Sequence, residues 1–132
     1  MAKGRKVKEI SFTMSNKVGL LSEVTRAVAG AKVNITSICA YAMENNAYFM
    51  LTTDSNTKAK RALEPMGVLI EERDVVEIEV PDKPGELQKI AKKIAEAGID
   101  IEYMYATASS GKKETCIFMT ADNPKAIRTI NK

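Results

Sequence analysis

The chain repeats one pattern of apolar residues and glycines after 66 positions, as from Gly19 to Gly85. The apolar positions agree in place and in period, although few residues are identical. The aligned pairs are Gly19 with Gly85, Leu21 with Leu87, Val24 with Ile90, Val28 with Ile94, Asn34-Ile35 with Asp100-Ile101, and Ile10, Phe12 and Met14 with Val76, Ile78 and Val80. A chain of 132 residues holds two such copies of roughly 65 residues each. We predict two tandem copies of one small folding unit.

The elements of the unit follow from its periodicity. Alternation over 7–14 predicts a strand, and helical spacing after Gly19 predicts a helix. Runs 34–42 and 47–53 predict a hairpin with a turn at Glu44-Asn45-Asn46. A helix near 56–66 and a fourth strand at Val68-Leu69-Ile70 complete the copy. The order is the split βαβ plan of ferredoxin-like α+β domains, with antiparallel sheets and helices on one face.

The second copy has matching signals but no sequence for a last strand. Its predicted strands cover 100–108 and 114–121, joined through Ser109-Ser110-Gly111-Lys112, and a shift of two residues matches 115–120 to 47–52. Asn123-Pro124 predicts the start of its second helix, as a capping residue and a first-turn proline. We therefore predict domains at 1–73, with a basic tail at 1–6, and at 74–132. The first strand of the second copy is then an unpaired edge unless another segment covers it.

Composition excludes several functions. The chain has no histidine, no CxxC pair and no glycine-rich cofactor loop, so we expect no catalytic residues, no metal and no cofactor. Four of its 20 basic residues lie among the first eight residues, and the rest of the chain holds 16 basic and 17 acidic residues. A nucleic-acid-binding protein usually has a basic stripe on its folded surface, so nucleic acid is not an expected partner. No apolar run approaches the ~18 residues of a membrane span, and the amino terminus lacks the pattern of a secretory signal. Two isolated cysteines, Cys39 and Cys116, suit the reducing cytoplasm.

Two loops carry a family resemblance. The segments Asn16-Lys17-Val18-Gly19-Leu20-Leu21-Ser22-Glu23-Val24 and Val33-Asn34-Ile35 resemble the ACT domain family. Asp82-Lys83-Pro84-Gly85-Glu86-Leu87 with Ile99-Asp100-Ile101 resembles its Asp-x-Pro-Gly loop more closely, whereas the first copy has Asn16 for the aspartate and Val18 for the proline. The whole chain is similar to small free-standing tandem ACT proteins. The resemblance implies a regulatory, allosteric module that binds an amino acid at the strand-1/helix-1 loop where two ACT units meet, as a homodimer or beside a metabolic enzyme.

The two loops differ as seats for an amino acid. A helix start offers free amides and partial positive charge to a carboxylate, and the first copy retains every such amide. In the second copy Pro84 removes a donor, and Glu86 adds a competing carboxylate. We therefore expect the first copy to be the better ligand site and the second mainly to complete the interface. The predicted ligand-binding residues are Asn16, Val18, Gly19, Leu20, Leu21, Asn34, Ile35, Asp82, Gly85, Glu86, Leu87, Asp100 and Ile101.

Other interpretations of these residues stay open at this stage. Asn16 and Asn34 suit caps and turns, the glycines suit tight turns alone, and the cysteines suit inert core positions. An assembly module without a small ligand is one alternative function. RNA binding on a ferredoxin-like sheet is another, although the aromatic signature of an RNA-recognition sheet is missing.

Overall fold

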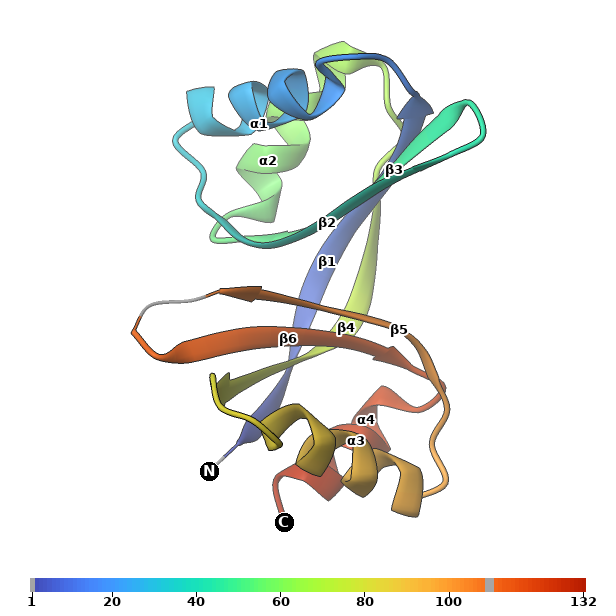
Figure 1. Cartoon of the computed structure of the whole chain (residues 1–132). Helices are drawn as coiled ribbons and strands as arrows, with labels where there is room; N and C mark the ends of the chain where they lie inside the picture. The colour runs from blue at the N-terminus through green and yellow to red at the C-terminus, as the bar shows by residue number, and fades with distance from the viewer. Residues whose placement is uncertain (1, 109–110) are drawn as a thin grey trace. The chain divides into compact units, whose positions relative to one another are not determined.

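The computed structural model describes residues 2–108 and 111–132 and forms two compact units. Lys8–Arg73 is called the first unit here, and Met1–Val7 with Asp74–Lys132 the second. The elements in the described residues (Figure 1) are β1 (Lys3–Ser15), α1 (Leu20–Gly30), β2 (Ile35–Met43), β3 (Asn46–Thr53), α2 (Asn56–Leu63), the 3-10 helix η1 (Glu64–Met66), β4 (Glu71–Pro81), α3 (Glu86–Glu96), β5 (Ile101–Ala108), β6 (Lys113–Thr120) and α4 (Asn123–Ile130). The β-α-β-β-α order occurs twice, which confirms the predicted fold class. The predicted connection at Ser109-Ser110 lies outside the described residues.

In the first unit, β3 lies between β1 and β2 in an antiparallel arrangement. The pairs Phe12↔Phe49 and Ile10↔Leu51 place apolar side chains on one face, which α1 and α2 cover (Figure 1). The rings of Phe12 and Phe49 stack with their centroids 5.0 Å apart. The buried core comprises Ile10, Phe12, Leu20, Val24, Val28, Val33, Ala47, Phe49, Leu51, Ala59 and Leu63.

In the second unit, β6 lies between β4 and β5. Val76↔Phe118 and Ile78↔Cys116 are the pairs that face α3 and α4. The buried core comprises Val76, Ile78, Val80, Ile90, Ile94, Ile99, Cys116, Phe118, Ala126 and Ile130. The two units therefore use the same face of the same strand arrangement for their cores.

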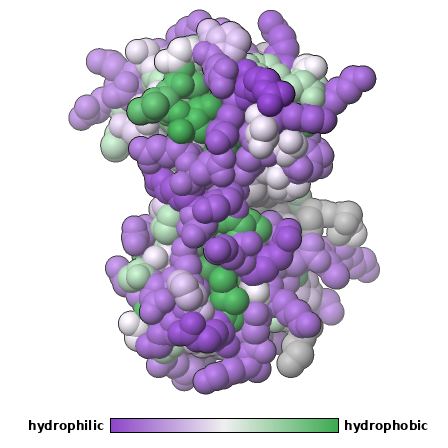
Figure 2. Space-filling model, turned by 180° about the vertical axis from the view of Figure 1, so that it is seen from behind, coloured by the Kyte–Doolittle hydropathy of each residue, from purple (hydrophilic) through white to green (hydrophobic). Residues whose placement is uncertain are grey.

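A few large apolar side chains remain exposed. Figure 2 shows a largely hydrophilic face with patches of hydrophobic surface over both units. The exposed apolar side chains of the first unit include Val18, Leu21, Met43 and Leu69. Single exposed apolar residues are ordinary, but Val18 and Leu21 occupy the loop and helix start singled out by the sequence.

Asparagines at equivalent places tie α2 and α4 to the sheets. Asn56 donates to the Lys8 carbonyl at 3.0 Å, and Asn123 donates to the Asp74 carbonyl at 2.9 Å. The helices are capped by the residues before them: the Ser55 and Asp122 side chains accept from the amides of Lys58 and Lys125. The prediction that Asn123 is the capping residue is therefore wrong. Asp122 is the cap, because the Asn123 side chain is engaged with β4 and with Thr120.

The residues of β3 and β6 that occupy equivalent positions in the two copies differ by one from the predicted equivalence. Met14 pairs with Ala47 and the equivalent Val80 pairs with Glu114, so Ala47 corresponds to Glu114 and Phe49 to Cys116. The predicted match of 47–52 to 115–120 is therefore wrong by one position. A single-residue slip moves every side chain of a strand to the other face, so the correction changes which residues meet the helices.

The fourth strand of the first copy begins later than predicted. Residues 68–70 lie outside any strand, and β4 starts at Glu71 and continues to Pro81. One strand therefore includes both the end of the first repeat and the predicted first strand of the second. The apolar run Val68-Leu69-Ile70 instead packs in part against the first core, through Val68 and Ile70.

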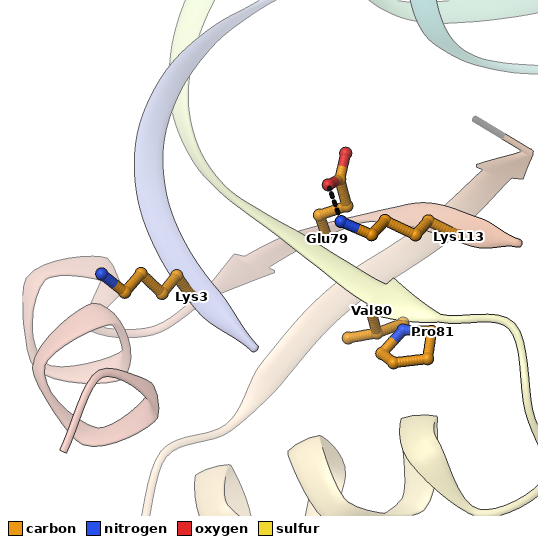
Figure 3. A pocket seen from close by; sticks show the side chains of 5 residues that line it. All are labelled: Lys3, Glu79, Val80, Pro81 and Lys113. Carbon is orange, nitrogen blue, oxygen red and sulfur yellow. Dashed lines mark ion pairs between the residues drawn. The ribbon is translucent and has the colours of Figure 1, made fainter. Parts of the chain in front are cut away.

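The amino-terminal residues supply the strand that the second copy lacks. Residues 3–6, predicted as a basic tail, form the start of β1 and belong to the second unit, where β1 lies beside β4. Lys3 also lines a hollow of about 220 Å³ with Glu79, Val80, Pro81 and Lys113 (Figure 3). The Glu79–Lys113 ion pair there, at 3.5 Å, joins two largely exposed side chains and contributes little to stability.

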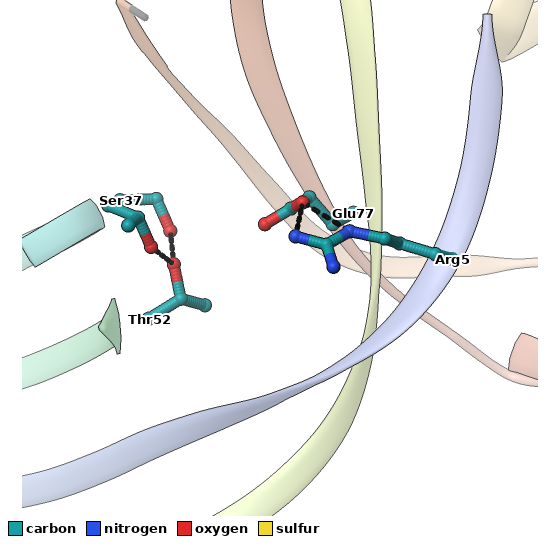
Figure 4. Close-up of polar contacts among 5 residues, drawn as sticks. Arg5, Ser37, Thr52 and Glu77 are labelled. Carbon is teal, nitrogen blue, oxygen red and sulfur yellow. Dashed lines mark hydrogen bonds and ion pairs between the residues drawn. The ribbon is translucent and has the colours of Figure 1, made fainter. Parts of the chain in front are cut away.

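Specific contacts hold this strand in place. The Gly4 amide donates to the Asn131 side chain at 2.7 Å, and the Gly4 carbonyl accepts from it at 2.9 Å. Arg5 donates to Glu77 at 2.8 Å through Nε, and its Nη2 lies 2.6 Å from the same oxygen (Figure 4). A Cβ on Gly4 would lie 3.4 Å from Val76, so a small residue suits this position. The edge of β4 is thus covered by residues more than 60 positions away in the chain.

We expect Asn131→Ala to lower the free energy of unfolding by about 1–2 kcal/mol, because it removes two hydrogen bonds that hold β1 on the second unit. Chemical denaturation monitored by circular dichroism measures the change. Lys132→Ala, at the neighbouring exposed residue, is the control and should leave stability unchanged. Equal stability of both variants would contradict the structural role of the amino-terminal strand.

Candidate functional site

The start of α1 lacks a side-chain cap. Gly19 occupies the N-cap position with φ +86°, a left-handed conformation that favours glycine. The Leu20 amide donates to the Lys17 carbonyl at 3.3 Å, and the Glu23 amide donates to the Gly19 carbonyl at 3.0 Å. Within the described residues, no acceptor is present for the amides of Leu21 and Ser22. These two donors and the positive end of the helix dipole are available to an anion.

An open groove lies beside this helix start. Its volume is about 290 Å³, and it lies between the β1–α1 loop, the first turn of α1 and the β2–β3 hairpin. The lining residues are Asn16, Lys17, Gly19, Leu20, Leu21, Ala40, Tyr41, Ala42, Ala47 and Phe49. Four predicted site residues, Asn16, Gly19, Leu20 and Leu21, thus come together at one groove.

The other predicted residues of the first copy lie elsewhere. Val18 is fully exposed and is not part of the groove lining. The Asn34 amide donates to the Asp54 carboxylate at 3.0 Å, and its carbonyl accepts from the Asp54 amide at 3.0 Å. Asn34 therefore joins the start of β2 to the turn before α2. Ile35 is half-buried and packs against the core.

The floor of the groove is the part that sequence reasoning missed. Ala40 pairs with Phe49 and Ala42 pairs with Ala47 across the hairpin, on the face that carries the core. The signal was present as Ala40 and Ala42 at alternate positions of one strand and Ala47 on the strand beside it. Tyr41 and Tyr48 alternate to the opposite face, where their rings stack at 5.0 Å. Hydroxyl pairing between Ser37 and Thr52 joins the same strands (Figure 4).

The polar groups of the loop are fixed by local contacts. The backbone amide of Asn16 donates to the Asn45 carbonyl at 2.8 Å, which ties the loop to the β2–β3 turn. Asn16 also lines the groove. The Lys17 ammonium lies 3.1 Å from the Glu23 carboxylate, and both side chains are largely exposed. This pair is screened by solvent and is weak.

The loop of the second copy repeats the backbone but not the chemistry. Gly85 is again an uncapped left-handed N-cap, with φ +85°. The Glu86 carboxylate follows it and lies 2.8 Å from the Lys89 ammonium; this hydrogen bond holds the pKa of the Glu86 carboxyl below its usual value. Asp82 and Leu87 are exposed beside the same loop, whereas the Asp100 carbonyl accepts from the Ala121 amide at 2.9 Å and the half-buried Ile101 begins β5.

The position equivalent to the groove floor also differs in charge. Glu114 stands where the first copy has Ala47, opposite Ala108 on β5. Its Oε1 lies 3.9 Å from the Cys116 Sγ. Burial of the thiol, together with this nearby carboxylate, raises the pKa of Cys116 to about 11. The second copy thus holds carboxylates both at the helix start and at the hairpin.

No group of three or more histidine, cysteine, aspartate and glutamate side chains able to hold a metal occurs among residues 2–108 and 111–132. None of the helices in that part of the chain has the length and apolar character needed to cross a membrane.

The chain is similar to known proteins over nearly its whole length. No curated protein matches the chain significantly. The solved structure of protein BT0572 from Bacteroides thetaiotaomicron is similar with a TM-score of 0.84 and 27% identity, over 96% of this chain and 87% of that one. The ligand-free regulatory subunit of aspartate kinase from Thermus thermophilus is similar in fold, with a TM-score of 0.69 and 19% identity over 96% of this chain and 93% of that one. The family model for an ACT domain pair matches residues 5–131. The resemblance inferred from the two loops is confirmed: this chain belongs to the ACT domain family, as a pair of ACT domains.

Proposed function

We propose that this chain is a regulatory protein that binds an amino acid at the β1–α1 loop of the first unit. The observation that carries the proposal is an uncapped helix start that opens onto a groove of about 290 Å³. Membership of the ACT domain pair family supports a regulatory role, as does the similarity in fold to a regulatory subunit of aspartate kinase. A groove of this size is close to the lower end of small-ligand sites, which suits a single amino acid.

The groove offers a partner for each end of a zwitterion. The amides of Leu21 and Ser22 can donate to the ligand carboxylate, and Gly19 lets it approach without a side chain in the way. The Asn16 side chain can accept from the ligand ammonium. In this proposal Val18, Asn34 and Ile35 shape the loop and the neighbouring strand around the ligand.

The second copy is proposed to support the interface. Glu86 and Glu114 place negative charge where a ligand carboxylate would bind, so the free energy of binding is less favourable there. Its loop residues lie outside the groove of the first unit and are proposed to contact a neighbouring unit, not the ligand. These are Asp82, Gly85, Glu86, Leu87, Asp100 and Ile101.

Association of two chains is the second part of the proposal. β2 and β5 are the outermost strands of their units, and an outer strand can pair with another chain. Val18, Leu21 and Met43 expose apolar surface around the groove and the β2 edge. A homodimer would cover this surface and shelter the ligand, and a metabolic enzyme is the proposed target of regulation. The free thiols Cys39 and Cys116 suit the cytoplasm as its location.

The same outer strands also favour an assembly module without a small ligand. A thermal-shift screen with the twenty amino acids separates the two functions, because a ligand that binds the folded state raises the melting temperature. We expect at least one amino acid to stabilise the protein by about 2–3 kcal/mol at one hundred times its Kd. Molar mass from light scattering tests the dimer on the same samples. A dimer that no amino acid stabilises would be the assembly module.

Gly19→Ala and Gly85→Ala form a matched pair of variants. An alanine methyl group at either position would meet no residue other than its chain neighbours within 4 Å, so neither variant causes a clash. Both glycines have φ near +85°, so each variant should lose about 1–2 kcal/mol of stability through backbone strain. Calorimetric titration with the amino acid that the thermal-shift screen identifies should show about tenfold weaker binding for Gly19→Ala and unchanged binding for Gly85→Ala. Weaker binding in Gly85→Ala alone would assign the ligand to the second copy.

Cysteine reactivity tests the position of Glu114. With a pKa of about 11, the Cys116 thiol is almost wholly protonated at pH 8 and should alkylate very slowly in the folded protein. Glu114→Gln removes the adjacent negative charge and should lower that pKa, so iodoacetamide labelling of Cys116 should increase severalfold by mass spectrometry. Glu102→Gln, at an exposed position of β5, is the control. Unchanged labelling in Glu114→Gln would place the carboxylate away from the hairpin face.

A further inference from the structure

The groove of the first unit has a lining that selects among amino acids. We infer that its ligand carries an apolar side chain, aliphatic or aromatic, seated on the floor formed by Ala40, Ala42, Ala47 and Phe49. This inference rests on the proposed function and names the ligand class for the same site. Floor and helix side are both apolar, because Leu20 and Leu21 of α1 also line the groove.

The space for a side chain comes from the small residues of the hairpin. The three alanines occupy positions on the face that carries the core, where most side chains of this unit are larger. Phe49 is almost fully buried and is held by its stacking on Phe12, so it supports the alanines with a rigid apolar side chain. Each methylene that a ligand buries on such a surface strengthens binding by about fourfold.

The charges around the groove disfavour ionised side chains. Among the ten described lining residues, Lys17 alone is charged, and its largely exposed ammonium lies 3.1 Å from the Glu23 carboxylate. No lining residue is a carboxylate, so the ammonium of a lysine ligand would lose water without gaining a partner. An acidic side chain would place a second negative charge near the ligand carboxylate, and the largely exposed Lys17 ammonium would attract it only weakly through solvent.

A homologous series of ligands measures this preference on the unmodified protein. Calorimetric titration with alanine, 2-aminobutyrate, norvaline and norleucine should show affinity that increases up to fourfold per added methylene. Lysine and glutamate should bind at least about tenfold more weakly than norleucine. Tighter binding of lysine or glutamate would overturn the apolar class and leave amino-acid binding intact. Binding of no amino acid at all would overturn the proposed function itself.

A pair of charge variants locates the preference in the first unit. Ala42→Asp places a carboxylate on the groove floor, at an exposed position of an outer strand that tolerates a polar residue. It should weaken norleucine binding about tenfold or more and strengthen lysine binding. Ala108→Asp makes the same change at the equivalent position of β5, opposite Glu114, and should change neither affinity. Equal effects of both variants, or an effect of Ala108→Asp alone, would contradict the inference.

Leu21→Asp and Leu87→Asp repeat the comparison on exposed helix residues, in case the strand variants do not fold. Leu21 lines the groove, whereas Leu87 is its counterpart on the loop of the second copy. Only Leu21→Asp should lose norleucine binding. Retained norleucine affinity in this variant would contradict an apolar ligand against α1.

Discussion

The pairing of β3 with β1 is the constraint on which both the core and the groove depend. Because side chains alternate along a strand, the register that opposes Phe12 to Phe49 also determines that Ala47 and Ala42 face α1. A slip of one residue would turn Tyr41 and Tyr48 toward the helices and remove the groove. The stacking of the two phenylalanines and the burial of Ile10 and Leu51 oppose that slip, because it would expose a whole apolar row.

A repeated backbone with different side chains allows the two copies to differ in function. Both copies have an uncapped helix after a left-handed glycine, Gly19 or Gly85, so both present amides at the same point of the fold. What differs is the charge around those amides. The first copy surrounds them with apolar and amide groups and the Lys17–Glu23 ion pair, whereas the second adds Glu86 and Glu114. The shared frame provides the donors, and the few residues around it decide whether an anion is attracted.

The second unit shows how a short repeat is completed. Within the described residues no strand follows α4, and the first residues of β1 lie beside β4. Asn131 and Glu77 hold this segment through Gly4 and Arg5. The basic residues at the amino end are therefore part of the sheet, and their side chains are exposed on it.

The sequence by itself determined the local features of this protein. Periodicity was enough for the two copies, their helices and their hairpins, and the glycines and adjacent residues were enough for the two loops, because these signals depend on neighbours a few positions apart. Four residues of the groove, Asn16, Gly19, Leu20 and Leu21, were predicted for the same reason. Only the tertiary structure decided that β1 begins at Lys3, that β4 begins at Glu71, that Ala47 corresponds to Glu114, and that alanines form a floor beneath α1. These features depend on strand partners far apart in the chain, and a pattern of period two fits two registers equally well until packing against the helices selects one.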